Sequence, residues 1–244
     1  MPTQRQNEKV VAFVLYPGLT AFDLSGPLQV MSELATIRPE IRPVVVGERI
    51  EPMDTDASVQ IVPEQAFEGV PHPHVLVVPG GTRPTLKAMS APAIRNYVRT
   101  AAETADAVAS VCTGALILAS VGLLQGRNAT THWATSAILE SLGARYHRKR
   151  WVEDGRFITS AGVSAGIDMG LQLAARLTDE PTAREVQRAL DYDPQPPFGG
   201  LDYGEIGFAL RTRRAAASLA APLLAARSKR LTEQERTTSR TGKR

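Results

Sequence analysis

Short, uninterrupted apolar segments recur along this chain, and segments with helical spacing of apolar residues lie between them. The clearest are Val10 to Pro17, His74 to Gly81 and Ala107 to Val111. Strands that are apolar at nearly every position are typical of parallel sheets buried on both faces. The alternation therefore predicts an α/β fold, an open sandwich with a mostly parallel central sheet.

In open α/β sheets, ligands bind beyond the carboxyl ends of the strands. Three residues of possible chemical interest, Asp23, Gly80 and Cys112, each follow a predicted strand. We therefore expect them to lie at one edge of the sheet and to form the functional site.

The composition favours a globular protein. Hydrophobic residues make up 43% of the 244 residues and charged residues 22%, which argues against wholesale disorder. A single cysteine cannot form an internal disulfide. The polar N-terminus does not resemble a signal peptide, and no apolar run reaches the roughly 18 residues that span a membrane. We expect a cytoplasmic protein without a membrane partner.

Positive charge is concentrated at the C-terminus. Residues 211–244 contain ten Lys or Arg and two Glu, whereas the rest of the chain is mildly acidic. We predict a catalytic domain over residues 1–210 and a basic helical extension over residues 211–244, interrupted at Pro222 and ending in a mobile tip. The extension has no aromatic side chain that could stack on a base, so we expect no nucleic-acid partner.

Cys112 is the strongest catalytic candidate. It ends a small-residue strand, and Thr113 and Gly114 open a helix without a spacer, which is the layout of a nucleophile elbow. The N–H groups at the start of that helix are expected to lower the pKa of the thiol and to favour the thiolate. The alternative is a buried structural cysteine.

Asp23 has two interpretations. At the start of a helix it is a preferred N-cap residue. Next to Cys112, burial and a nearby thiolate would keep its carboxyl group protonated, which would make it a general acid.

Other candidates carry weaker signals. Gly80 and Gly81 end a strand, where their backbone N–H groups could point at a ligand. His132 and His147 are possible bases, but neither has the spacing of a metal site. No dinucleotide-binding or phosphate-binding glycine motif follows any predicted strand.

Taken in order, these motifs resemble the ThiJ/PfpI superfamily and, within it, the isocyanide hydratases. The segments that carry the resemblance are LYPGLTAFDLSGP, VLVVPGGT, SVCTGALILASVGLLQGRNATTHW, AGVSAGIDMGL and LDYDPQPPF. The resemblance implies a flavodoxin-like three-layer sandwich and a homodimer. It also implies hydration of an isocyanide to an N-substituted formamide without metal or cofactor, with Cys112 as nucleophile, Thr113 beside it and Asp23 as acidic partner.

Two departures from related proteins argue against protease, amidase and glyoxalase activities. Protease and amidase members usually have His directly after the cysteine, where this chain has Thr113, and many glyoxalase-like members have Glu at the position of Asp23. Sensor members carry a DNA-binding region of about 100 residues, and 44 residues follow Gly200 here. A cysteine-based sensor of a ligand or of oxidative stress, and a glyoxalase- or amidase-type enzyme, remain the alternatives.

Overall fold

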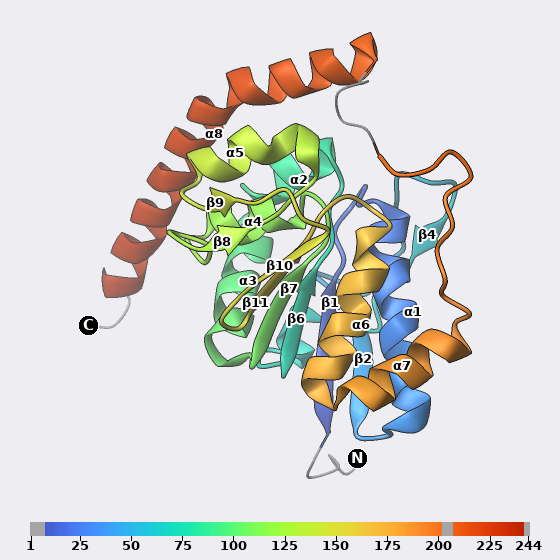
Figure 1. The fold of residues 1–244 in the computed structure, drawn as a ribbon. Helices are drawn as coiled ribbons and strands as arrows, with labels where there is room; N and C mark the ends of the chain where they lie inside the picture. Colours follow the sequence, from blue (N-terminus) through green and yellow to red (C-terminus); the bar gives the residue numbers. More distant parts are fainter. Residues whose placement is uncertain (1–7, 202–206, 242–244) are drawn as a thin grey trace.

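The computed structural model describes residues 8–201 and 207–241, and its core is a seven-stranded sheet (Figure 1). The strand order is β10-β11-β7-β6-β1-β2-β5, and every neighbouring pair is parallel except β10 with β11. The strands are β1 (Lys9–Val14), β2 (Ile41–Gly47), β5 (Gln65–Ala66), β6 (Val75–Val78), β7 (Ala107–Ser110), β10 (Trp151–Asp154) and β11 (Phe157–Ser160). The predicted mostly parallel sheet is confirmed.

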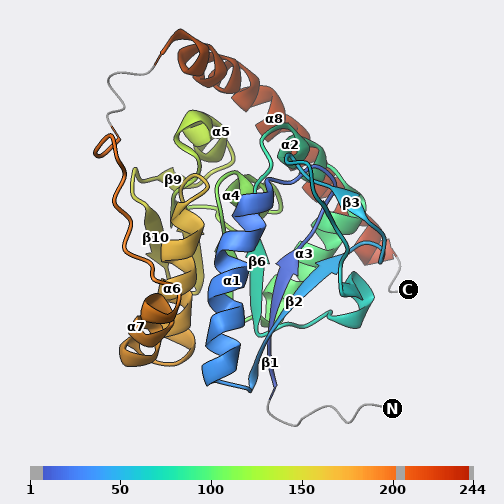
Figure 2. The same ribbon diagram turned by 90° about the vertical axis from the view of Figure 1, so that its right-hand side faces the viewer.

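Helices cover both faces of this sheet (Figure 2). On one face α1 packs against α6 and α7, while α3 and α4 lie on the opposite face. The helices are α1 (Ala21–Ile37), α2 (Arg83–Ala88), α3 (Pro92–Thr104), α4 (Gly114–Ser120), α5 (Ser136–Ser141), α6 (Ala165–Leu177), α7 (Glu180–Ala189) and α8 (Phe208–Thr241). The fold is thus a flavodoxin-like three-layer sandwich. No helix among the described residues combines the length and the apolar character needed to cross a bilayer.

Burial explains the strand pattern. Every residue of β6, β7 and β11 is buried, because helices pack on both faces of the sheet centre. Two small sheets lie outside it, β3 (Met53–Asp54) with β4 (Gln60–Ile61) and β8 (Asn128–Ala129) with β9 (Arg145–Tyr146).

The C-terminal helix α8 packs across the outside of the α3–α4–α5 layer (Figure 1). It continues through Pro222, where we had expected an interruption. Helix α8 extends to Thr241, and residues 242–244 lie outside the described part of the chain. The mobile tip therefore remains a prediction.

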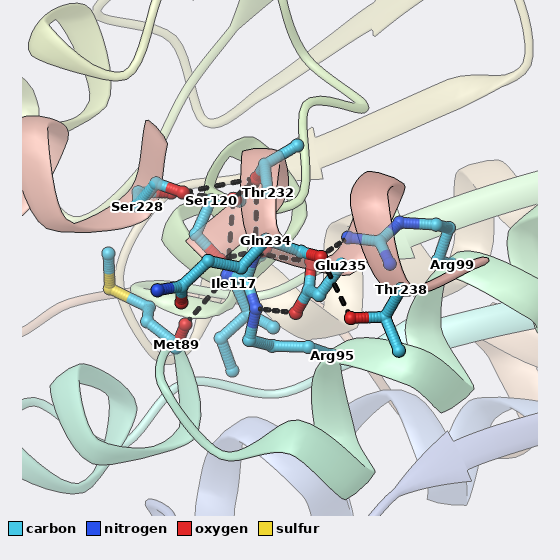
Figure 3. A network of polar contacts seen from close by, with 10 residues as sticks. All are labelled: Met89, Arg95, Arg99, Ile117, Ser120, Ser228, Thr232, Gln234, Glu235 and Thr238. Carbon is cyan, nitrogen blue, oxygen red and sulfur yellow. Dashed lines mark hydrogen bonds and ion pairs between the residues drawn. The ribbon is translucent and has the colours of Figure 1, made fainter. Parts of the chain in front are cut away.

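A buried arginine joins α8 to the body (Figure 3). Arg95 of α3 is only 1% exposed, and it donates two hydrogen bonds of 2.7 and 3.0 Å to the Glu235 carboxylate on α8. It also donates to the carbonyl oxygens of Met89 and Ser120, which follow α2 and end α4 respectively. Ser228 of α8 donates a 2.6 Å hydrogen bond to the same Ser120 carbonyl. One guanidinium group therefore connects α2, α3, α4 and α8.

Replacing Glu235 by glutamine is expected to lower the free energy of unfolding by about 3 kcal/mol. Removing one partner of a buried ion pair leaves the other charge buried without compensation, which costs about 3–5 kcal/mol, and the partial exposure of Glu235 places the effect at the lower end of that range. Urea unfolding measures the change. Glu233→Gln, on the exposed side of the same helix, is the matched control, and equal stability of the two variants would contradict this role of Arg95.

Candidate active site

Cys112 lies between the end of β7 and the start of α4, at the predicted elbow. Its φ angle is +55°, in the left-handed region that few residues other than glycine adopt. Its N–H donates to the carbonyl oxygens of Ser160 and Ala161, both at 3.1 Å, and its own carbonyl accepts a 2.9 Å bond from the Thr131 hydroxyl. Three contacts from other segments thus hold the elbow in a strained conformation, as is common at functional sites.

The elbow also requires a glycine. A Cβ atom on Gly114 would lie 2.0 Å from the carbonyl oxygen of Val78, so only glycine lets α4 begin this close to β6. This close approach fixes where the cysteine side chain emerges above the sheet.

Asp23 is fully buried in the first turn of α1. The N-cap of this helix is Thr20, so the structure contradicts the interpretation of Asp23 as a helix cap. Instead, Asp23 Oδ2 accepts a 3.1 Å hydrogen bond from the Gly80 N–H, and Oδ1 has no hydrogen-bond partner among the described residues. A buried acceptor atom without a partner costs free energy of folding unless a proton or a ligand meets it.

Burial raises the pKa of the Asp23 carboxyl to about 7, while the nearby Cys112 thiol and the Gly80 N–H favour the carboxylate and limit the shift. Burial also raises the pKa of the Cys112 thiol above its usual range, and a negative charge on Asp23 raises it further. The N–H groups of Thr113 and Val163 act in the opposite direction but are outweighed. The predicted lowering of this pKa by the helix N-terminus was therefore wrong about the net direction.

These two groups compete for one negative charge. Because each anion disfavours the other, an ionised thiol near neutral pH requires that Asp23 holds the proton. Proton sharing between Cys112 and Asp23 in the resting site remains a prediction.

The stability of the protein should fall as the pH rises from about 4 to about 7, through this carboxyl. In that range the unfolded chain has released the proton that folded Asp23, with its pKa raised to about 7, still holds. Raising the pH therefore favours unfolding until the folded carboxyl also ionises. In urea unfolding, Asp23→Asn should gain stability relative to the wild type as the pH rises across this window. A constant difference would contradict the shift.

The Thr113 hydroxyl is hydrogen-bonded to other residues of the protein. Its Oγ1 accepts hydrogen bonds from the N–H groups of Gly81 (3.0 Å) and Thr82 (3.3 Å) and lies 2.8 Å from Thr85 Oγ1. Thr85 Oγ1 is 3.1 Å from the Tyr16 hydroxyl, which donates to the carbonyl of Pro79.

The donor in each hydrogen bond of the series from Thr113 through Thr85 to Tyr16 can be assigned. Burial raises the pKa of Tyr16 well above its usual range, so its hydroxyl stays protonated and donates to the Pro79 carbonyl. Tyr16 must then accept from Thr85, and Thr85 must accept from Thr113. The Thr113 hydroxyl proton is therefore committed to the protein, and this residue positions the loop after β6.

This arrangement corrects the prediction for Gly80 and Gly81. Their N–H groups do not point at a ligand, because the first donates to Asp23 and the second to Thr113. A Cβ atom on Gly80 would lie 2.6 Å from both Asp23 Oδ2 and Thr113 Oγ1. The glycine allows the loop to bind the two candidate side chains directly.

A cavity of about 480 Å³ opens beside the elbow. Its walls include Thr131, Ala161 and Val163, which all contact Cys112, and Phe22, the neighbour of Asp23. The remaining lining residues are His132, Trp133, Tyr146, Arg148, Lys149, Arg150, Gly162, Ser164, Ala165 and Leu201.

The two histidines have different positions. His132 lines this cavity, and its Nδ1 accepts a 3.3 Å hydrogen bond from the Ala134 N–H. His147 is bonded to Asn128 at 2.9 Å and does not line the cavity. Within residues 8–201 and 207–241 there is no group of three or more metal-ligating side chains.

Sequence reasoning missed Tyr16, Thr85 and Thr131. Tyr16 ends the first apolar segment, so a hydroxyl at the carboxyl end of a buried strand was an available signal. Thr85 and Thr131 gave none, because their roles depend on contacts with distant segments.

Comparison with known proteins gives consistent matches. The model of the DJ-1/PfpI family matches residues 9–176. The isonitrile hydratase of Pseudomonas putida is 39% identical over 188 residues, which cover 77% of this chain and 80% of that protein. The crystal structure of a THiJ/PfpI family protein from Pseudomonas syringae superposes with a TM-score of 0.78 at 34% identity, covering 92% of this chain and 90% of that one. The HTH-type transcriptional regulator CdhR of Pseudomonas aeruginosa is 37% identical over 113 residues, 46% of this chain and 33% of the regulator.

Proposed function

The chain belongs to the DJ-1/PfpI family, and on that basis we propose that it hydrates an isocyanide to an N-substituted formamide. The observation that carries the proposal is the buried pair of Cys112 and Asp23, in which one carboxyl oxygen has no partner among the described residues. The similarity to the isonitrile hydratase over most of both chains supports the same reaction.

In the proposed mechanism, the proton of the thiol passes to Asp23 and the sulfur attacks the terminal carbon of the isocyanide. Asp23 returns the proton to that carbon, which gives a thioimidate bound to Cys112. Water then adds to the same carbon, and Asp23 takes one of its protons and passes it to the nitrogen. Collapse of the adduct breaks the carbon–sulfur bond, and the remaining hydroxyl proton passes through Asp23 to the sulfur as the formamide leaves.

Thr113, Gly80 and Gly81 act as positioning residues in this mechanism. The Gly80 N–H holds Asp23 by one oxygen, and the Gly81 N–H is held by Thr113, the residue after the nucleophile. Acid and nucleophile are therefore bound to the same loop, which keeps their separation constant during proton transfer.

An ultraviolet assay of formamide formation from an aromatic isocyanide tests the proposal. Methylglyoxal and a peptide amide, run in parallel, test the glyoxalase and amidase alternatives. Turnover of the isocyanide but not of the other two compounds supports hydration. Turnover of methylglyoxal or the peptide amide, with no turnover of the isocyanide, would refute the proposed hydration.

A ligand sensor is the second candidate, supported by the similarity to the regulator CdhR. A sensor would form a Cys112 adduct or bind a ligand stoichiometrically without multiple turnovers. Product formation beyond one equivalent per chain separates the two functions.

We also propose a homodimer, the most common closed assembly. Light scattering should give twice the chain mass of 26.3 kDa. A monomer mass across a wide concentration range would exclude it.

A further inference from the structure

The loop of residues 79–82 joins β6 to α2 and binds the candidate acid, and a buried tyrosine binds this loop in turn. Tyr16 lies two residues beyond the end of β1 and is only 1% exposed. Its hydroxyl donates a 2.9 Å hydrogen bond to the carbonyl oxygen of Pro79, the first residue of the loop. A Cβ atom on Gly81 would lie 3.3 Å from the same hydroxyl, so the phenol lies directly against the loop backbone.

The same hydroxyl also reaches the far end of the loop through two threonines. Thr85, fully buried in α2, donates to the Tyr16 oxygen at 3.1 Å and accepts from Thr113 at 2.8 Å. Thr113 in turn accepts from the N–H groups of Gly81 and Thr82. One phenol group is therefore bonded to both ends of the loop.

The loop needs these bonds because its last residue is strained. Thr82 has a φ angle of +48°, in the left-handed region that is costly for a β-branched residue. Such a conformation persists only where surrounding contacts enforce it. If the contacts weaken, the loop can relax, and the Gly80 N–H that holds Asp23 Oδ2 at 3.1 Å moves with it.

We propose that Tyr16 is a positioning residue for the reaction, because its hydroxyl fixes the loop and thereby the separation of Asp23 and Cys112. It acts through the Pro79 carbonyl and the Thr85 hydroxyl rather than on the substrate. This inference rests on the proposed isocyanide hydration.

The first test is kinetic. Tyr16→Phe keeps the buried ring and removes the hydroxyl. We expect kcat for an aromatic isocyanide to fall about tenfold while KM changes by less than about twofold, because the reacting groups are misplaced and substrate binding is not. Thr85→Val should lower kcat in the same way, and Thr85→Ser, which keeps the hydroxyl, should recover most of that loss.

Tyr97→Phe is the matched control. Tyr97 is also buried, and its hydroxyl donates a 3.0 Å hydrogen bond to the backbone carbonyl of Val70. Val70 precedes β6, at the edge of the sheet opposite the loop. Both tyrosine variants should lose similar stability in urea unfolding, but Tyr97→Phe should keep the wild-type kcat. An equal fall of kcat in the two variants would overturn the proposal.

The second test is a pH profile, which a loss of stability alone would not move. Burial and the charge of Asp56 raise the pKa of Asp23 to about 7, whereas the Cys112 thiol and the Gly80 N–H favour its carboxylate. A relaxed loop weakens the Gly80 bond and removes part of this support for the carboxylate. The pH at which Cys112 alkylation by iodoacetamide changes should therefore move upward in Tyr16→Phe and stay in place in Tyr97→Phe.

The two tests separate this inference from the function on which it rests. If the wild type does not turn over the isocyanide, hydration fails, and the alkylation profile alone decides the role of Tyr16. An upward move that is specific to Tyr16→Phe supports the positioning role. A profile that Tyr16→Phe leaves unchanged overturns it, whether or not the isocyanide is a substrate.

Discussion

Replacing Cys112 with alanine or serine is expected to remove nearly all turnover of an isocyanide. The proposed reaction forms a carbon–sulfur bond, and a serine hydroxyl in the same buried position is a far weaker nucleophile at neutral pH. Steady-state rates of formamide production measure the loss, and cooperative urea unfolding checks that each variant folds.

Mass spectrometry of the wild type provides the complementary observation. Because Cys112 is the chain's single cysteine, an isocyanide adduct on the intact protein can be assigned to it. A Cys112→Ala variant with more than a few per cent of wild-type kcat/KM would show that the thiol is not the catalytic nucleophile.

Asp23→Asn is expected to lower kcat/KM by a factor on the order of 10² or more, the range typical of a lost general acid or base. Asparagine keeps an acceptor for the Gly80 N–H, so the loop stays anchored, but it cannot exchange a proton with the sulfur. Glu33→Gln, which removes a carboxylate further along α1, is the matched control.

The pH dependence of thiol reactivity separates proton transfer from a merely structural role. In the wild type, the rate of Cys112 alkylation by iodoacetamide should change near pH 7, where the Asp23 carboxyl ionises. That change should be absent in Asp23→Asn, because the paired acid is gone. A variant with wild-type rates, or with an unaltered alkylation profile, would exclude Asp23 from catalysis.

Local patterns predicted the sheet and the elbow. Residues that are apolar at every position became the buried strands β6 and β7, and the direct passage from strand to helix placed Cys112 at the junction. In each case the signal lies within a few residues of the structure that it predicts.

Contacts between distant segments were beyond prediction. The Gly80 and Gly81 N–H groups face Asp23 and Thr113, which come from two other segments of the chain. The net pKa shift of Cys112 depends on how completely these segments exclude water. Residue spacing carries no information about either quantity, so the predicted ligand contacts and the predicted thiolate bias were wrong.

The ion pair between Arg95 and Glu235 joins two residues that the ribosome adds at very different times. During synthesis, α3 and the strands around it leave the ribosome while Glu235, 140 residues later, has not yet been added. Until then the Arg95 guanidinium lacks its carboxylate, and enclosing it would cost the desolvation of an unpaired charge. We therefore expect final consolidation of the α3–α4 layer only after Glu235 has been synthesised, and ribosome-bound chains that stop before Glu235 should remain sensitive to protease in this layer.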